Sequence, residues 1–128
     1  IEETRVYLDA LSQNLIKPGV FEIFTCNADG SGKRQVTNLG ATSFAPSWHP
    51  SNRQIIFMSN THDPKSHQFD LYLIDADGAN LERVTFHPAF DGFPMFSPDG
   101  KYLAFCSNRD SKDDRETHVF LAEWREHQ

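Results

Sequence analysis

Short apolar segments separated by turn residues recur along most of the chain. The best-formed set consists of four segments: Phe44–Trp48, Gln54–Ser59, Phe69–Ile74 and Leu81–Thr85. Segments of this length, rich in aromatic and aliphatic side chains and bounded by Gly, Pro, Asn and Asp, predict β-strands. The second and third segments are apolar at successive positions instead of alternating, so we expect a four-stranded antiparallel sheet that is covered on both faces.

The same pattern returns after 48 residues. Phe21–Asn60 aligns with Phe69–Asn108 without a gap, and twelve of the forty aligned pairs are identical. A period of this length is typical of repeat architectures in which one unit cannot bury its apolar surface alone. Four-stranded sheets stacked face to face, like the blades of a β-propeller, meet that requirement. We therefore predict an all-β fold, a fragment of a β-propeller with four-stranded antiparallel blades.

The repeat divides the chain into four parts. These are an N-terminal segment, the outer strands of a first partial blade, a complete blade, and a last blade that lacks its fourth strand: residues 1–20, 21–43, 44–86 and 87–128. Within the N-terminal segment, Arg5–Leu11 lies one period before Arg53–Ser59, and this offset favours a strand of the incomplete blade. The spacing of Val6, Ala10 and Leu11 also fits one side of a short helix.

Turn residues locate the tight connections between strands. In Ser97–Gly100, proline presets φ at the second position of the turn and Asp-Gly supplies a positive φ. We expect positive φ at Gly100 and at Gly78, which also follows Asp. The aligned segment His49–Asn52 lacks Asp-Gly, so we expect a weaker turn there. Pro46 lies inside a predicted strand, where proline is tolerated only at a bulge or where no N–H donor is needed.

Aligned aromatic residues indicate which side chains pack between blades. Phe57 and Phe105 are one period apart in the second strand of successive blades, and we expect both to be buried core residues. Trp48 and Phe96 occupy the same place in the strand nearest the axis of a propeller. This recurrence favours packing between blades over an aromatic platform for a ligand.

Composition and charge exclude some classes of partner. The net charge is −6 and no run of Lys or Arg occurs, which argues against a nucleic-acid surface. No apolar segment approaches the ~20 residues of a membrane span. Cys26 and Cys106 lie in apolar segments and are interpreted as small buried hydrophobes, so they do not decide the cellular compartment. The first residue is Ile, so we expect a processed product or part of a longer chain.

Two sequence motifs resemble those of a known family. Gly92–Arg109 contains a strand, the turn Ser-Pro-Asp-Gly and a second strand, and Phe69–Gly78 contains a strand followed by Asp-Ala-Asp-Gly. These motifs resemble TolB-type β-propeller repeats, and the resemblance covers roughly residues 20–122. It implies a ring of about six or seven blades, of which this chain supplies about two and a half. The resemblance also implies a bacterial protein with a periplasmic or secreted location.

The longer connections are expected to lie on one face. In a four-stranded blade, the loops from the second to the third strand and from the fourth to the next first strand emerge together. Here these loops are long and polar, and loops on a rigid frame commonly carry function. The candidate partner-binding residues of this face are His62, Asp63, His67, His87, Asp91, Arg109, Asp110, Asp113, Asp114 and Arg115.

Some of these residues are of metal-ligand types. His62, Asp63 and His67 suit zinc or a similar ion, but their spacing matches no closed motif. The acidic residues 110–114 lack the glycine and the terminal glutamate of a hand-type calcium loop, and Lys112 lies among them. We interpret both segments as solvated loops, and we predict no metal and no cofactor. No Gly-x-Ser-x-Gly elbow or glycine-rich phosphate loop occurs, so we also predict no catalytic residue.

Three functions remain compatible with this sequence. The first is a non-catalytic propeller segment that acts as a protein-binding scaffold, within a larger propeller or an oligomeric complex. The second is the substrate-gating propeller of a prolyl-oligopeptidase-like or tricorn-like serine peptidase, whose catalytic domain would be separate. The third is a subunit of an envelope or electron-transfer assembly in which partners supply the missing blades. The repeat is shared by all three, so the fold alone does not choose among them.

Overall fold

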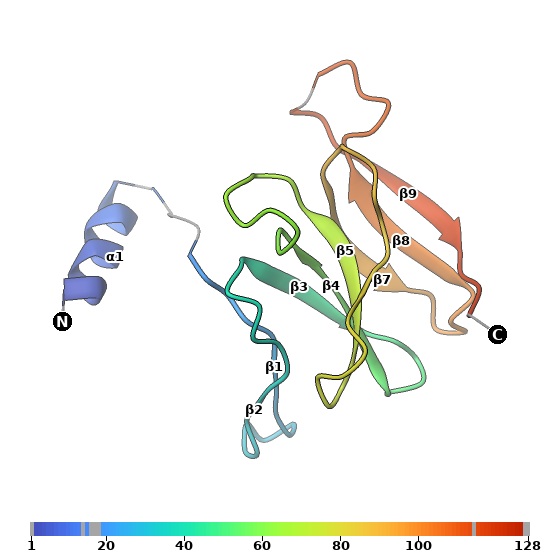
Figure 1. The fold of residues 1–128 in the computed structure, drawn as a ribbon, viewed down its shortest axis with the longest axis horizontal. Coiled ribbons are helices and arrows are strands. Elements are labelled where there is room, and N and C mark those ends of the chain that lie inside the picture. Colours follow the sequence, from blue (N-terminus) through green and yellow to red (C-terminus); the bar gives the residue numbers. More distant parts are fainter. Residues whose placement is uncertain (1, 14, 16–18, 114, 127–128) are drawn as a thin grey trace.

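The computed structural model describes residues 2–13, 15, 19–113 and 115–126. Within these residues, one helix, α1 (Glu2–Ser12), precedes three antiparallel sheets (Figure 1). The first sheet pairs two strands, the middle sheet four and the last sheet three, each in sequential order. The strands are β1 (Phe24–Thr25) and β2 (Arg34–Gln35); β3 (Ser43–Trp48), β4 (Gln54–Ser59), β5 (Asp70–Asp75) and β6 (Glu82–Arg83); β7 (Asp91–Phe96), β8 (Tyr102–Ser107) and β9 (His118–Glu123).

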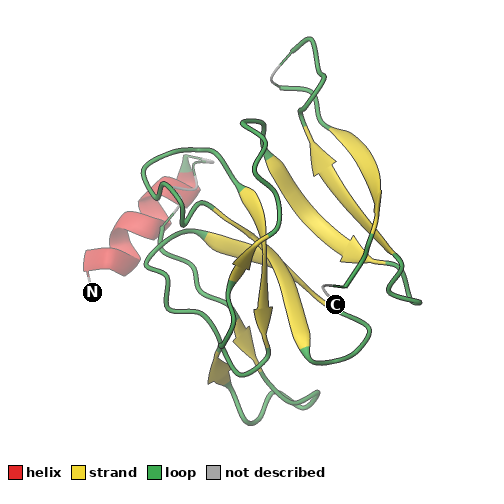
Figure 2. Ribbon diagram, turned by 45° about the vertical axis from the view of Figure 1, so that its right-hand side comes forward, coloured by secondary structure: helices red, strands yellow, loops and turns green. Residues whose placement is uncertain are grey.

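These sheets confirm the predicted fold class. All strand pairs named above are antiparallel, and β4–β5 and β8–β9 pair in the same register one period apart. The three sheets follow one another through the molecule as separate small sheets (Figure 2). β4 and β5 are buried along almost their whole length, because the middle sheet is covered on both faces as the sequence predicts.

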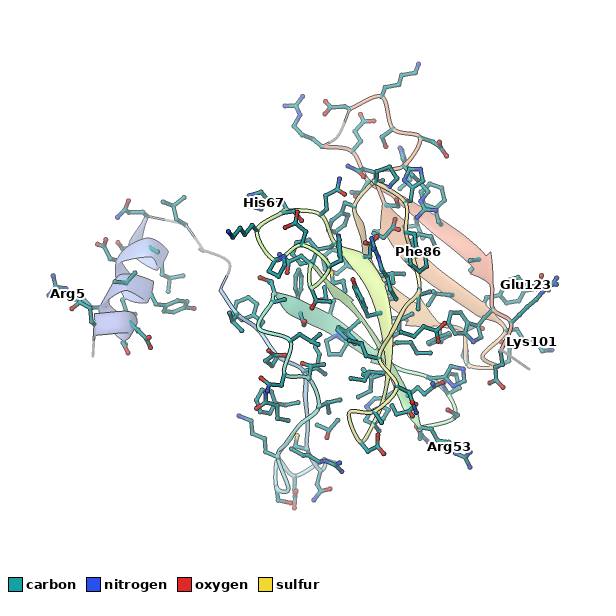
Figure 3. The ribbon with its side chains drawn as sticks, in the orientation of Figure 1. Arg5, Arg53, His67, Phe86, Lys101 and Glu123 are labelled. Carbon is teal, nitrogen blue, oxygen red and sulfur yellow. The ribbon has the colours of Figure 1, made fainter. Side chains whose placement is uncertain are left out.

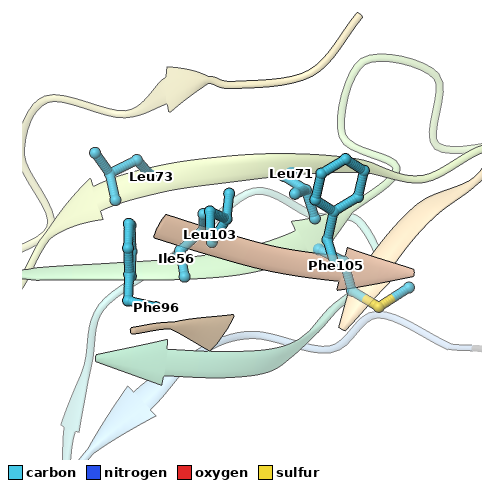
Figure 4. Packing of buried hydrophobic residues seen from close by; sticks show 7 residues of the cluster. Ile56, Leu71, Leu73, Phe96, Leu103 and Phe105 are labelled. Atoms are coloured by element: carbon cyan, nitrogen blue, oxygen red, sulfur yellow. The ribbon is translucent and has the colours of Figure 1, made fainter. Parts of the chain in front are cut away.

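Two apolar clusters lie on the two sides of the middle sheet. The cluster between the middle and last sheets includes Ile56, Met58, Leu71, Leu73, Phe96, Leu103 and Phe105 (Figure 4). The cluster between the first and middle sheets includes Ile23, Val36, Ile55, Phe57, Tyr72 and Ile74. Phe57 is 0% exposed and Phe105 is 6% exposed, which confirms that both are core residues. Alternate side chains along β4 and β5 therefore pack against the first sheet on one face and against the last sheet on the other.

A β-bulge interrupts the first strand of both the middle and the last sheet. The register of β3 against β4 shifts between Phe44 and Ser47, and that of β7 against β8 shifts one period later. Ala45 and Phe93, the residues before the two prolines, both have φ of 52°. A bulge removes the need for an N–H donor at the next residue, so Pro46 is accommodated as predicted.

The tight turns have the predicted backbone conformation. Gly78 has φ of 90° and Gly100 has φ of 70°, which confirms both glycine assignments. In the divergent turn, Asn52 takes the place of Gly100 with φ of 57°, as asparagine does more readily than most residues. A Cβ atom on Gly78 would lie 2.8 Å from the carbonyl oxygen of Val36, so the turn also needs glycine for space. The His49 ring packs edge-on against Phe96, with centroids 4.6 Å apart.

The N-terminal segment differs from the strand that the repeat offset favours. Glu2–Ser12 is the helix α1, so that preference is wrong and the helical alternative is correct. The aligned strand would place Asp9 where Phe57 and Phe105 are buried, and burying an unpaired carboxylate is costly. In the helix no residue is buried, Asp9 stays in solvent, and two glutamates occupy the first turn.

Two further expectations fail at the first sheet. Trp48 is 48% exposed, whereas the aligned Phe96 is 8% exposed. Cys26 is also exposed, Cys106 is half-buried, and both are free thiols. The reason is the same in both cases. Among the described residues, the first sheet has only its two outer strands. It therefore has no inner strands to cover Trp48 and Cys26, whereas β7 and β8 of the last sheet cover the middle sheet.

Candidate functional site

Three long connections approach one another at one end of the sheets. Residues 60–69, 108–113 and 115–117 project at the upper end of Figure 1, and the tight turns lie at the other end. His67 marks the loop end in Figure 3, and Arg53 lies at the turn end. A hollow of ≈ 450 Å³ lies between the loops and is lined by His67, Gln68, His87, Pro88, Ala89, Phe90, Asn108, Arg109 and Asp110. We call this surface the loop face.

Two asparagines fix the bases of these loops. The side-chain oxygen of Asn60 accepts a hydrogen bond from the Thr42 N–H at 2.9 Å. One period later, Asn108 accepts from the Phe90 N–H at 2.8 Å. Each bond ties the end of a second strand to the residue before a first strand. The repeated Ser-Asn dipeptide thus determines where the loops leave the sheets. This role of the two asparagines was not predicted from the sequence.

Asp91 and Arg109, two of the predicted site residues, lie together in the interior of this end. Asp91 is 0% exposed, and the Arg109 Nη2 atom donates to both of its carboxylate oxygens at 2.7 and 2.6 Å. The Arg109 guanidinium also lies over the rings of Phe105 and Phe120, 5.1 and 5.6 Å from their centroids. Asp91 therefore holds the fold and is not accessible to a partner.

His62 lies over a buried carboxylate of the middle sheet. Its Nε2 atom is 3.4 Å from Asp70 Oδ2, and its Nδ1 atom is 3.1 Å from the Tyr72 hydroxyl. Asp70 also accepts from Arg83 Nε at 3.1 Å. Burial raises the pKa of Tyr72 above its usual value, so the phenol stays protonated and can donate to the imidazole. His62 thus fastens the loop to the sheet.

Asp70 and Arg83 were not among the site residues predicted from the sequence. They are 13 residues apart and meet only because β5 and β6 pair in this register. One signal in the sequence could have found Asp70, because it aligns with Glu22 in the first sheet. Each of these two carboxylates accepts a hydrogen bond from the threonine hydroxyl that follows the last strand of its sheet. A recurring acid at the start of an apolar strand is a recognisable pattern of a buried polar contact.

His67 and His87 are exposed residues that line the hollow of the loop face. The Ala89 N–H donates to His87 Nδ1 at 3.1 Å, which leaves the proton of the neutral ring on Nε2. The Gln68 side-chain amide donates to the Pro88 carbonyl and links two of the loops. Asp110 is exposed beside them with φ of 62°. These side chains present hydrogen-bonding groups to the solvent at the hollow.

The outer part of the third loop is occupied by an exposed ion pair. Arg115 Nη2 lies 2.6 Å from Asp113 Oδ2, and these hydrogen bonds hold the pKa of Asp113 below its usual value. Asp63 is exposed, with its backbone in a turn. Asp114 lies outside the described residues. Among the residues that the structure describes, no three His, Cys, Asp or Glu side chains are grouped as metal ligands.

The stacked sheets, repeated bulges and loop geometry define this chain as part of a β-propeller. Residues 22–114 match the model of the TolB beta propeller domain family, and the chain belongs to this family. The resemblance seen in the sequence is thereby confirmed.

Solved structures agree with this assignment. The putative TolB from Agrobacterium tumefaciens is 28% identical with a TM-score of 0.69, over 85% of this chain and 39% of that one. The crystal structure of TolB from Acinetobacter baumannii shares the fold with a TM-score of 0.67 at 21% identity, over 84% of this chain and 25% of that one. The chain thus spans well under half of either protein.

A curated relative has an enzymatic name. The chain is 36% identical over 58 residues to dipeptidyl-peptidase 5 of Porphyromonas gingivalis. The match covers 45% of this chain and 8% of that protein. Of the described helices, none has the length and apolar character that crossing a membrane requires.

Proposed function

We propose that this chain is a non-catalytic β-propeller segment that acts as a protein-binding scaffold within a larger propeller or assembly. The observation that carries this proposal is the arrangement of the loop face. Polar side chains from three loops gather around one hollow, on sheets whose positions are fixed by buried contacts. Loops on a rigid frame bind partners without a large ordering cost.

The loop residues divide into supports and contacts under this proposal. Arg109 bonds to the buried Asp91 carboxylate, and His62 lies 3.4 Å from the buried Asp70 carboxylate, so both support the loops from below. His67, His87 and Asp110 are exposed at the rim of the hollow and contact the partner. Asp63 and Arg115 are exposed further out, where rim charges change the rate of association more than its strength.

Site-specific cross-linking tests the scaffold function. A photoreactive phenylalanine analogue replaces His67 or His87 on the loop face, and Asn52 or Asp99 at the turn end serves as the matched control. We expect the loop positions to give one discrete cross-linked protein in cells and the turn positions to give none. Equal products from both ends would refute the assignment of the binding face. Hydrolysis of peptides by the purified chain, abolished by a single substitution, would refute the non-catalytic function.

A second function is favoured by one observation. The relative named dipeptidyl-peptidase 5 matches 58 residues of this chain, so this segment can instead belong to the gating propeller of a serine peptidase. The sequence encoded beside this segment discriminates between the two. A neighbouring α/β-hydrolase region with a Gly-x-Ser-x-Gly elbow would favour the gating function. A subunit of an envelope or electron-transfer assembly is the third possibility, and cross-linked partners would reveal it.

The location follows the family. We propose a periplasmic or secreted location, since the two solved structures are called TolB and the resemblance of the repeat implies such a location. Free thiols at Cys26 and Cys106 are compatible with this location because the two residues lie in different sheets. Fractionation of cells that express the gene tests it, and recovery with cytosolic markers would contradict it.

A further inference from the structure

Titratable and charged side chains meet at the hollow of the loop face. Two of its lining residues, His67 and His87, are exposed histidines, and two others, Arg109 and Asp110, carry opposite charges. All lining residues lie between positions 67 and 110. The middle sheet, the last sheet and the connection between them therefore form the hollow without a contribution from either end of the chain.

Arg109 is the fixed cation of this hollow. Its Nε atom donates to Ser107 Oγ at 3.0 Å, and its Nη2 atom donates to both carboxylate oxygens of Asp91. Nη1 is the remaining donor group of the guanidinium. The Arg109 side chain is 23% exposed, whereas that of Asp91 is 0% exposed. A ligand in the hollow can therefore reach the arginine but not the carboxylate that holds it.

The two histidines add donors whose charge depends on pH. The neutral His87 ring accepts the Ala89 N–H at Nδ1, and its Nε2–H is left for a ligand. Protonation of His87 turns Nδ1 into a second donor and ends its contact with Ala89, so the ring can turn toward a ligand. Histidine gains its proton between about pH 8 and about pH 5, so acidification places two further positive charges at the hollow.

The sign of the charge at the hollow depends on these two protons. With both imidazoles neutral, Arg109 contributes one positive charge, and Asp110 and the buried Asp91 contribute two negative charges, so the sum is −1. With both imidazoles protonated, the sum becomes +1. The Asp113–Arg115 ion pair lies further out on the same loop and is neutral as a pair. The hollow therefore repels an anionic group at neutral pH and attracts it in acid.

Apolar side chains beside the histidines strengthen this effect. Pro88, Ala89 and Phe90 also line the hollow. The Phe90 ring packs edge-on against Phe69, with centroids 6.1 Å apart, so the middle sheet holds this part of the lining in place. Apolar walls lower the effective dielectric constant, and charges inside a concave surface then act over a longer range. The volume of ≈ 450 Å³ is within the range of about 300–1,000 Å³ that ligand pockets have.

We propose that the hollow of the loop face binds an acidic segment of a protein partner in mildly acidic solution and releases it near neutral pH. Protonated His67 and His87, together with Arg109, donate to carboxylates of that segment. Asp110 repels the same carboxylates once the imidazoles are neutral. This inference rests on the proposed scaffold function and adds the chemistry of the partner and the condition that controls its binding.

Titration with an acidic peptide tests the proposal. The probe is a labelled peptide of alternating Asp and Gly, and the same peptide with Asn in place of Asp is the neutral control. Binding to the full chain is followed by fluorescence anisotropy at about pH 7.5 and about pH 5.5, where Asp side chains of the peptide stay ionised. An exposed ion pair contributes up to about fivefold in affinity, so we expect the Asp peptide to bind about tenfold more tightly in acid. The Asn peptide should show no such change.

Variants of the protein assign the pH dependence to the hollow. The double variant His67→Gln with His87→Gln should lose the tighter binding in acid. His118→Gln, the matched control at an exposed histidine of β9, should keep it. Asp110→Asn removes the repelling carboxylate and should tighten binding of the Asp peptide by up to about fivefold at both pH values. Circular dichroism confirms that the variants are folded.

Several outcomes would overturn the proposal. Equal affinity at the two pH values would do so, as would absence of binding at both. Tighter binding in acid that the double variant retains, or that the Asn peptide shares, would mean that the hollow does not recognise carboxylates through its histidines. None of these results affects cross-linking at the loop positions in cells, so the scaffold function is tested separately.

Discussion

The middle and last sheets have aligned sequences and the same register, yet one is covered on both faces and the other on one. Leu73 is 5% exposed in β5, whereas Leu121, one period later in β9, is 70% exposed. The same contrast separates Leu71 from Val119. The strand pattern is equal in both sheets, so the burial of a residue depends on whether a neighbouring sheet is present. Stability in this fold is therefore unevenly distributed over aligned positions.

Polar contacts also differ between the two sheets. The last sheet has a buried Asp91–Arg109 pair, and the aligned residues of the middle sheet are Ser43 and Thr61. Ser43 instead shares a hydrogen bond with Ser59 at 2.9 Å. The middle sheet has its buried carboxylate at Asp70, near the outer strand. The aligned residues Ser43 and Asp91 thus both form hydrogen bonds, but with different side-chain groups and partners.

Breaking the buried ion pair should have the largest effect. Arg109→Ala leaves the Asp91 carboxylate buried and unpaired, so we expect a loss of about 3–5 kcal/mol in the free energy of unfolding. The aligned change Thr61→Ala should stay within about 0.5 kcal/mol. Denaturant unfolding monitored by circular dichroism measures both. The double variant Asp91→Asn with Arg109→Met should recover part of the loss, and no recovery would contradict this account.

Truncating the aligned leucines tests the contrast directly. Leu73→Ala opens a cavity between two sheets and should cost about 2–5 kcal/mol. Leu121→Ala removes a side chain that is exposed in this structure, and the change should be within about 0.5 kcal/mol. The same unfolding measurement applies. A large cost for Leu121→Ala would show that its face is covered in solution by a further sheet or by a second copy of the chain.

The turns offer a smaller and more local comparison. Gly100 has φ of 70°, so Gly100→Val should destabilise the last sheet by about 1–2 kcal/mol through left-handed strain. Asn52→Gly in the aligned turn should change stability by less than about 1 kcal/mol, because glycine accepts the same φ. Thermal unfolding of the two variants measures these effects. A harmless Gly100→Val would mean that the turn can relax to another conformation.

The smallest expected effect is a dependence on pH in the same turn. The Ser97 hydroxyl and the Lys101 N–H donate to Asp99 and hold its pKa below the usual value of 3.8. A lowered pKa stabilises the folded state above that value, and the contribution disappears as the pH falls through the folded pKa. Asp99→Asn should therefore reduce stability at neutral pH and have no effect in acid. Ser51→Ala, its aligned control, should leave the acid branch of the profile unchanged.

The sequence predicted the parts of the structure that depend on local pattern. The main strands, the bulge at Pro46 and the positive φ at Gly78 and Gly100 follow from residue types and their spacing. Two failures have a common origin. The repeat offset predicted a strand where Asp9 would be buried, and Trp48 was expected to be covered by strands that are not among the described residues. Both expectations concern the side of the first sheet on which no inner strands are present among the described residues.

The candidate site was predicted in outline but not in detail. The long loops do converge, and His67 and His87 line one hollow. Sequence reasoning could not separate accessible residues from buried ones, because the Asp91–Arg109 pair spans 18 residues and forms only in the folded register.

The contact of Gly78 with Val36 has a consequence for the geometry of a whole ring. No side chain lies between the glycine and the carbonyl oxygen of Val36, so two neighbouring sheets meet there backbone to backbone. Arg34 also donates to the Asp77 carbonyl beside this point, at 3.2 Å. The contact brings the outer parts of the two sheets to their closest backbone approach, and in a closed ring the angle between neighbouring sheets determines how many sheets fit. A larger residue at position 78 would widen the wedge and reduce the number of blades that close the circle.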